Sequence, residues 1–304
     1  MAQARPDPRP RSGPFVALGG SIAALGERGV GMNPRLAVWV VNGLLAGLAA
    51  VSLFPLLWML SVSFMPAGAA STLPAPLLPP AVTLDNYRRL FGSIGMGRYL
   101  LNSLGIAVLA TVISVGFNVM AGYAFAKLRF RGRDAIFKAL LGALVIPGQV
   151  AMLPLFLMLK PLGLINTYGG AVVPLMASVF GIFLVRQFAR GIPDDLLEAA
   201  RIDGASELRI FLTIIVPLLS PVLATLAIFS FLGSWNDFMW PLIVLTDDSL
   251  HTLPVALAGL SREHVQDSEL MMAGSVVTVL PVLVLFLALQ RQYMAGLMAG
   301  SVKG

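Results

Sequence analysis

The stretch YLLNSLGIAVLATVISVGFNVMAGYAF, residues 99–125, contains no Asp, Glu, Lys, Arg or His. About 20 apolar residues in a helix are enough to cross the roughly 30 Å hydrocarbon core of a bilayer, and this stretch is longer. Lipid offers the backbone no hydrogen-bond partners, so a chain that crosses it must be helical or form a closed barrel. The stretch therefore predicts a transmembrane helix.

Five more runs along the chain have interiors that lack ionisable side chains. They are residues 37–64, 139–159, 168–185, 216–235 and 270–290. The whole chain is 57% hydrophobic and 12% charged, whereas soluble domains carry about 25% charged residues. We therefore expect an all-α membrane protein with six transmembrane helices in contact with membrane lipid, and we exclude a soluble fold.

The orientation of these spans follows from the positions of Lys and Arg, which accumulate on the cytoplasmic side of a membrane. Cations are dense before the first span and after the second: Arg5, Arg9, Arg11, Arg28, Arg35, Lys127, Arg129, Arg131, Arg133 and Lys138. This pattern predicts that both termini are cytoplasmic and that the stretch 247–269 is an outward loop. It also accounts for the net charge of +6 without a nucleic-acid partner.

The N-terminal stretch differs from the rest of the chain, because it is rich in Pro, Arg and Gly. We expect residues 1–31 to be a disordered cytoplasmic tail and residues 32–304 to form the transmembrane domain. A signal peptide over residues 14–25 is disfavoured, since no cleavage site leads into a soluble domain. Met32 remains an alternative start of translation. On the outer side, a short interfacial helix is expected near residues 84–91.

The most informative polar segment lies between the fourth and fifth spans and reads GIPDDLLEAARIDGASELRIFLTIIVPLLSP, residues 191–221. Pro193 suits the first turn of a helix, and Asp194 and Asp195 suit its positive dipole end. Gly204 predicts the end of this helix, because glycine adopts the left-handed cap conformation readily.

A second short helix is predicted to follow, with Ser206 as its N-cap and Pro217 at the start of the next span. Within the first helix, Glu198 and Arg201 are three residues apart, a spacing at which they can form a weak pair. The small alanine side chains beside them permit close approach to a partner. An amphipathic connector whose charges face water is the alternative interpretation.

A resemblance favours the functional interpretation of this segment. Glu198, Ala199 and Ala200 are followed at fixed spacing by Gly204, Ile214, Val216 and Pro217. This pattern resembles the EAA signature of the permeases of binding-protein-dependent ABC importers, except that Val216 stands where Leu is usual. The resemblance implies that segment 191–217 couples to a cleft on a separate ATPase. The residues that it marks for ATPase coupling are Glu198, Ala199, Ala200, Arg201, Asp203, Gly204 and Pro217.

Further motifs are similar to the carbohydrate-importing branch of these permeases. They occupy residues 102–103, 123–127, 146–150, 153–156, 163–167, 235–238 and 252–254. The final run QRQYMAGLMAGSVKG, residues 290–304, is similar to the C-terminus of the second membrane subunit of maltose-type transporters. The resemblance implies the permease fold in a bacterial inner membrane. It also implies a second, non-identical permease, two ATPase subunits, an extracytoplasmic solute-binding protein and a sugar substrate.

Several kinds of chemistry are missing from the sequence. None of its four lysines, Lys127, Lys138, Lys160 and Lys303, stands between Gly and Ser or Thr as a P-loop requires. We therefore expect no enzyme activity and no cofactor on this chain, with ATP and Mg²⁺ bound by the partner ATPase. Cys is absent and only two His are present, so a metal cluster is not expected. An ion-coupled carrier or channel that acts alone is disfavoured, because the spans lack ionisable groups.

The polar residues in or near the spans carry amides, hydroxyls or aromatic rings: Asn118, Tyr123, Gln149, Thr225, Ser230, Ser234, Trp235 and Asn236. Such groups suit a neutral, hydroxyl-rich solute. We take Asn118, Tyr123, Gln149, Trp235 and Asn236 as the candidate substrate path. The alternative is that they form hydrogen bonds between helices. Asp237 is expected to cap or pair at the interface, and kinks are expected at Pro147, Pro154 and Pro174. Which sugar is carried does not follow from these residues.

Overall fold

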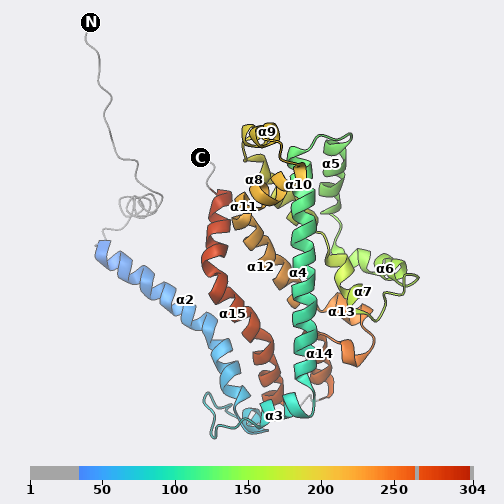
Figure 1. Ribbon diagram of the computed structural model, residues 1–304. Helices are drawn as coiled ribbons and strands as arrows, with labels where there is room; N and C mark the ends of the chain where they lie inside the picture. Colours follow the sequence, from blue (N-terminus) through green and yellow to red (C-terminus); the bar gives the residue numbers. More distant parts are fainter. Residues whose placement is uncertain (1–33, 264–266, 302–304) are drawn as a thin grey trace. The chain divides into compact units, whose positions relative to one another are not determined.

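The computed structural model describes residues 34–263 and 267–301, and within these ranges it contains helices and no strands (Figure 1). The expected tail 1–31 and the alternative start at Met32 lie outside the described residues. The chain divides into two units, residues 1–58 and 59–304. The described part of the first unit consists of the larger part of helix α2 (Pro34–Ser63), which is apolar around its whole circumference, as expected of a membrane span.

Three helices are each long and apolar enough to cross a membrane: α2, α4 (Met96–Lys127) and α15 (Ser268–Ser301). Three pairs of shorter helices satisfy the same criterion only when each pair is counted as one bent span. The described residues therefore contain three to six candidate spans. All six predicted apolar runs are found in these helices, but three of the runs are not continuous helices.

The predicted span 139–159 is broken most strongly. It contains the end of α5 (Arg133–Ala143) and all of α6 (Gly148–Leu159), whose axes differ by 108°. Pro147 precedes α6 and lacks the N–H that would continue the hydrogen-bond ladder. The kink expected at Pro147 is therefore confirmed. Pro154 lies within α6 and does not end it.

The next two predicted spans are also bent. The first contains α7 (Tyr168–Val172), the 3-10 turn η2 (Val173–Leu175) and the larger part of α8 (Val179–Arg190), with a bend of 43° after η2. This break follows Pro174, as expected. The second bend, of 79°, separates the short helix α11 (Val216–Leu218) from α12 (Ser220–Trp235), and it was not predicted from the sequence.

The core of the second unit lies where α4 packs against α8 and α12 (Figure 1). Gly122 on α4 allows this close packing: a Cβ atom there would stand 2.6 Å from Val185 on α8 and 3.0 Å from the backbone nitrogen of Arg186. Glycine is therefore required for the two helices to approach this closely. α12 also packs against α15.

At the end of the second unit that carries the predicted outward loops, the chain is more helical than expected. α3 (Asp85–Gly92) confirms the helix predicted near residues 84–91 and follows the 3-10 turn η1 (Ala69–Ser71), and its place at the membrane interface stays a prediction. The stretch 247–269 was expected to be a loop, but it contains η4 (Asp248–Leu250) and α14 (Leu253–Glu263). α13 (Met239–Val244) precedes it.

Candidate coupling site and solute pathway

The candidate coupling site is built around α9 (Asp194–Ile202), at the predicted cytoplasmic end of α4 and α8. Asp194 and Asp195 lie in its first turn, as predicted, whereas Pro193 is its N-cap, one residue before the first turn in which it was expected. Of the α9 side chains, only Leu197 is buried, with 2% of its surface exposed. Leu197 therefore anchors α9 in the core, and most of the other side chains of the helix are exposed.

Gly204 ends α9 in the way the sequence predicted. Its φ angle is +80°, its N–H donates to the carbonyl of Arg201 at 3.0 Å, and the N–H of Ala205 donates to the carbonyl of Ala200 at 3.0 Å. These two bonds form a Schellman motif, which satisfies the last carbonyls of the helix. The chain then reverses into α10 (Glu207–Ile210), where the Ser206 hydroxyl accepts a hydrogen bond from the N–H of Arg209 as the predicted N-cap.

Two ionic contacts attach α9 to the rest of the protein. The Lys127 ammonium, on a side chain only 6% exposed, donates to the Asp194 carboxylate at 2.6 Å and also to the backbone carbonyl of Ile192. At the other end of α9, Arg201 donates to the Glu207 carboxylate at 2.6 Å and 3.4 Å. Both ends of the helix are therefore held by charge-assisted hydrogen bonds.

The partner of Arg201 differs from the sequence expectation, which paired it with Glu198. The turn at Gly204 brings the start of α10 back beside the last turn of α9, so the carboxylate of Glu207 meets the guanidinium fork. The Tyr123 hydroxyl of α4 also donates to Glu207, at 3.2 Å. Glu207 thus joins three helices, and sequence spacing alone gave no signal of this contact.

These contacts are reflected in the acid–base properties of the site. The hydrogen bond from Lys127 lowers the pKa of Asp194 below its ordinary value. The hydrogen bond from Arg201 lowers the pKa of Glu207, and Glu207 in turn raises the pKa of Arg201. Favourable contacts to the charged forms produce these shifts, so all three groups are ionised at neutral pH.

A shared apolar core lies beneath the coupling site. Its buried members come from α4, α8, α9, α10, α12 and the segments that connect them. They are Val119, Tyr123, Val185, Ala189, Ile192, Leu197, Ile210, Ile215, Leu219, Val222 and Leu226. The segment after α10 is a π-helical turn, η3 (Phe211–Ile215), whose Phe211 ring lies 5.5 Å from that of Tyr123. Because protein interiors are closely packed, this core joins α9 to α4, α8 and α12 through direct side-chain contacts.

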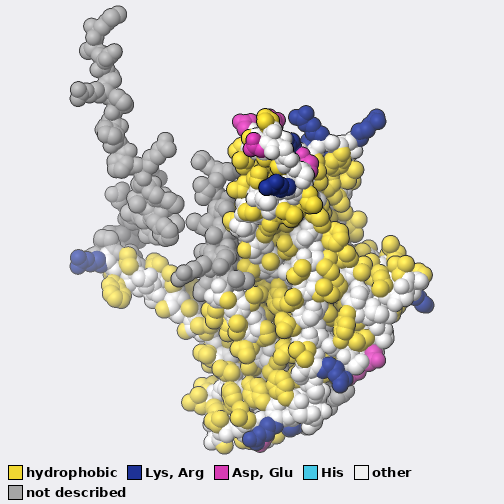
Figure 2. All heavy atoms as spheres, viewed as in Figure 1, with side chains coloured by type: hydrophobic (Ala, Val, Ile, Leu, Met, Phe, Trp, Pro, Cys, Tyr) yellow, Lys and Arg dark blue, Asp and Glu magenta, His cyan; other side chains and the backbone are white. Residues whose placement is uncertain are grey.

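The outer face of α9 carries most of the signature residues. Glu198, Ala199, Arg201, Asp203 and Gly204 are exposed, and Ala200 is half-buried against the core. Figure 2 shows charged side chains gathered over α9 and the neighbouring end of α5, beyond the hydrophobic flanks of the helices. Pro217 is exposed on α11 and does not belong to this face.

Ile202 adds an apolar group to the open side of α9, because it is 86% exposed. A groove of about 780 Å³ runs beside the helix. Its charged lining residues are Lys127, Arg129, Arg133, Asp194, Glu198, Arg201 and Glu207. An exposed isoleucine beside a charged groove is an arrangement that fits a protein partner.

The structure does not bring the five candidate substrate-path residues together. Asn118 is fully buried, donates to the hydroxyls of Ser114 at 3.0 Å and Ser178 at 3.5 Å, and accepts from the N–H of Ser178 at 2.9 Å. These bonds link α4 to the start of α8. The contacts of Asn118 therefore agree with the alternative interpretation, in which it forms hydrogen bonds between helices.

Tyr123 and Gln149 do not share the contacts of Asn118. The Tyr123 hydroxyl binds Glu207, so this side chain belongs to the coupling site. Gln149 lies in the first turn of α6 and is exposed. Neither residue lines the cavity that Ser114 and Ser178 border.

Trp235 and Asn236 lie at the end of α12. Trp235 is 1% exposed and its indole N–H donates to the carbonyl of Thr278 on α15 at 3.2 Å, whereas Asn236 is exposed and its amide donates to a carbonyl of its own helix. Asp237 accepts from the N–H of Trp240 at 3.3 Å, which confirms its expected capping role. The indole N–H of Trp235, its one polar side-chain group, is therefore used in a contact between helices.

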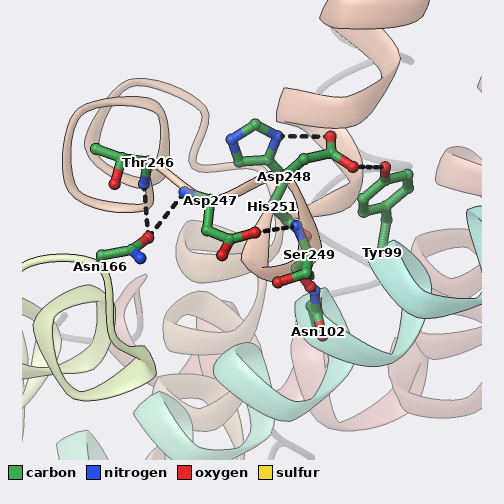
Figure 3. Close-up of polar contacts among 8 residues, drawn as sticks. All are labelled: Tyr99, Asn102, Asn166, Thr246, Asp247, Asp248, Ser249 and His251. Carbon is green, nitrogen blue, oxygen red and sulfur yellow. Dashed lines mark hydrogen bonds and ion pairs between the residues drawn. The ribbon is translucent and has the colours of Figure 1, made fainter.

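At the opposite end of α4, a polar network joins several of the carbohydrate-branch motifs (Figure 3). Asn102 donates to the backbone carbonyls of Ser249 at 3.0 Å and His251 at 2.9 Å, and the Tyr99 hydroxyl donates to Asp248 at 2.7 Å. These bonds fix η4 against α4. The motif at residues 102–103 therefore has a structural role in holding the outer segment.

Asn166 forms the second half of this network. Its side-chain oxygen accepts from the N–H groups of Thr246 at 2.9 Å and Asp247 at 2.8 Å, and its own backbone has a φ angle of +58° (Figure 3). Asn tolerates this left-handed conformation better than most residues. The Asn166 backbone N–H also donates to the carbonyl of Val244 at 2.8 Å, so one residue joins the motif at residues 163–167 to the end of α13 and the segment after it.

Known proteins resemble this chain over most of its length. The family described as binding-protein-dependent transport system inner membrane component matches residues 118–295. The arabinooligosaccharides transport system permease protein AraQ of Halalkalibacterium halodurans is 39% identical over 269 residues, which are 88% of this chain and 96% of AraQ. The trehalose transport system permease protein SugB of Mycobacterium tuberculosis is 36% identical over 275 residues, or 89% of this chain and 98% of SugB.

A solved structure shares the fold. The crystal structure of a bacterial ABC transporter involved in the import of the acidic polysaccharide alginate contains a chain that superposes with a TM-score of 0.75 at 26% identity, covering 86% of this chain and 98% of that one. The family description names an inner-membrane component of a transport system, and the three to six candidate spans among the described residues agree with a multi-pass membrane protein. With a family match over residues 118–295 and relatives aligned over nearly their whole length, this chain belongs to the inner-membrane components of binding-protein-dependent transport systems.

Proposed function

We propose that this chain is one of two non-identical permease subunits of an ATP-driven importer that carries a sugar across the bacterial inner membrane. The names of the relatives support the substrate class, since AraQ belongs to an arabinooligosaccharides transport system and SugB to a trehalose transport system. In this arrangement an extracytoplasmic binding protein delivers the sugar. Six spans, three of them bent, cross the bilayer with both termini in the cytoplasm.

The observation that carries the proposal is the attachment of α9. Lys127 and Glu207 anchor its two ends, and Leu197 anchors its middle in the core shared with α4, α8 and α12. Its Glu198, Ala199 and Gly204 remain exposed. A helix held rigidly on one side and open on the other is suited to receive a push from a partner and pass it to the membrane helices.

The partner in this proposal is a separate ATPase that binds ATP and Mg²⁺. The chain itself has no lysine in a P-loop context. Closure of two ATPase subunits would displace segment 191–217 and switch the access of the pathway. Because such coupling is reciprocal in binding free energy, the loaded binding protein should in turn alter the affinity of the assembly for nucleotide.

Gly204 offers a direct test of the coupling role. A Cβ atom there meets nothing within 4 Å in this chain, so a large side chain is free to project outward. The backbone has a φ angle of +80°, and Gly204→Trp adds roughly 1–2 kcal/mol of left-handed strain, which Asn tolerates better. Gly204→Asn is therefore the matched control.

The measurement is ATP-dependent uptake of labelled trehalose and arabinotriose by proteoliposomes that contain the co-purified assembly and its binding protein. We expect Gly204→Trp to lose both the ATPase subunits and uptake, while Gly204→Asn keeps both. Retention of assembly and transport by Gly204→Trp would refute the coupling role. Gradient-driven uptake by this chain alone would instead establish an ion-coupled carrier.

A further inference from the structure

A cavity of about 260 Å³ lies between α4, α8 and α12, away from the coupling site. It is also distinct from the five residues expected to form the substrate path, none of which lines it. The polar side chains in its lining are four serines, Ser114, Ser178, Ser230 and Ser234, and two phenylalanines, Phe180 and Phe229, lie beside them. No ionisable side chain is among its lining residues.

The position of the cavity fits a site within the membrane. Ser114 lies about 20 Å along α4 from Lys127, at the 1.5 Å rise of a helix, and so falls near the middle of the bilayer. The break between η2 and α8 supplies Pro174 and Ser178 to the lining. Solute sites in transporters are commonly built near the membrane midplane from such interrupted helices.

Two of the serine hydroxyl groups in the lining are held in place by hydrogen bonds that they accept. Ser178 already accepts from the N–H of Gly181 at 2.9 Å and from Asn118 at 3.5 Å, and Ser114 accepts from Asn118 at 3.0 Å. Each of the two hydroxyls therefore retains its own proton to donate. Ser234 is 7% exposed, and its oxygen has no hydrogen-bond partner among the described residues. A buried hydroxyl in this state is costly unless a ligand or water pairs with it.

The aromatic residues complete the chemical character of the cavity. The Phe180 and Phe229 rings meet edge to face, with centroids 6.1 Å apart, and both side chains are partly exposed. Aromatic faces pack against the C–H faces of sugar rings, while serine hydroxyls bond to their hydroxyl groups. A lining of this kind, free of charge, favours a neutral and hydroxyl-rich ligand.

We propose that this cavity binds one sugar ring of the solute as it crosses the membrane, with Ser114, Ser178, Ser230 and Ser234 as its hydrogen-bonding residues. The volume is slightly below the roughly 300 Å³ at which pockets for whole small molecules begin, so a single ring fits and an oligosaccharide passes ring by ring. The inference rests on the proposed function for the class of solute.

Gly233 provides the means to close the cavity. It lines the cavity on α12, and a Cβ atom there meets nothing within 4 Å. Gly233→Leu therefore fills the space without clashing at its first atom. Gly116→Leu is the matched control, because Gly116 is also an exposed helix glycine with nothing within 4 Å but does not line the cavity.

The assay uses the complete transporter in proteoliposomes with whichever of trehalose and arabinotriose the wild type accumulates. We expect Gly233→Leu to lower uptake by about tenfold or more, through exclusion of the ring, while ATP hydrolysis stimulated by the loaded binding protein is kept. Gly116→Leu should preserve both activities. Unchanged uptake in Gly233→Leu would overturn the assignment, and so would loss of the second permease subunit, which would mean that its side chains fill the cavity.

A second variant decides the matter if Gly233→Leu does not accumulate in the membrane. Ser230→Ala combined with Ser234→Ala removes two hydroxyls and leaves the space open, and it should lower uptake about tenfold while ATP hydrolysis continues. Wild-type uptake in this double variant would overturn the site. Absence of ATP-driven sugar uptake by the wild type would reject the proposed function itself, so the two failures are distinguishable.

Discussion

Lys127→Met is the most informative perturbation of the coupling site. Methionine keeps an unbranched apolar chain in a place where the lysine side chain is 6% exposed, but it removes the ammonium group. The carbonyl of Ile192, a residue that is 9% exposed, then loses its donor. A hydrogen bond from a charged donor contributes about 2 kcal/mol. Asp194 is open to solvent and adds nothing to this figure.

A loss of about 2 kcal/mol corresponds to an increase of about 30-fold in the local opening constant at the start of α9. Hydrogen exchange, followed by mass spectrometry on peptides from residues 192–202 of the purified assembly, measures this opening. Lys138→Met is the control, because Lys138 is exposed on α5. Exchange at wild-type rates in Lys127→Met would refute the claim that Lys127 anchors α9.

Three further results are expected. Gly122→Ala places a methyl group 2.6 Å from Val185 and should destabilise the purified assembly by about 1–3 kcal/mol, seen as a lower melting temperature that Gly116→Ala does not produce. The pKa of Glu207 is lowered in the folded protein, so its carboxylate contributes its full stabilisation above about pH 4.3 and loses it as the pH falls through the folded pKa. The rate of hydrogen exchange in the α9–α10 turn should therefore rise over that pH range in the wild type, and Glu207→Gln should show no such transition. Asn166→Ala should speed exchange of the two amides that this side chain holds, whereas Asn166→Asp should retain their protection.

The sequence predicted those parts of the structure that depend on local chemistry. Apolar runs located the membrane helices, and Pro193, Gly204 and Ser206 marked the ends of the coupling helices as observed. Proline predicted the bends at Pro147 and Pro174. Each of these features depends on residues near one another in the chain, where caps and backbone restrictions act.

The remainder depends on contacts between distant segments. Arg201 pairs with Glu207 because a turn folds α10 back, and Tyr123 serves the coupling site because α4 ends beside it. The serine cavity was missed for a similar reason. Ser114 and Ser178 come from two different spans, and the packing of α4 against α8, together with their common contact with Asn118, brings them together.

The central claim is that the exposed face of α9 contacts a separate ATP-hydrolysing subunit. The chain contains no cysteine, so Ala199→Cys creates a unique attachment point for a photoactivatable cross-linker on that face. Ser71→Cys, at the exposed last residue of η1, provides a control at the opposite end of the second unit. The account predicts that only the probe at residue 199 cross-links to an ATP-binding subunit in native membranes. Cross-linking at residue 71 alone, or at neither position, would contradict it.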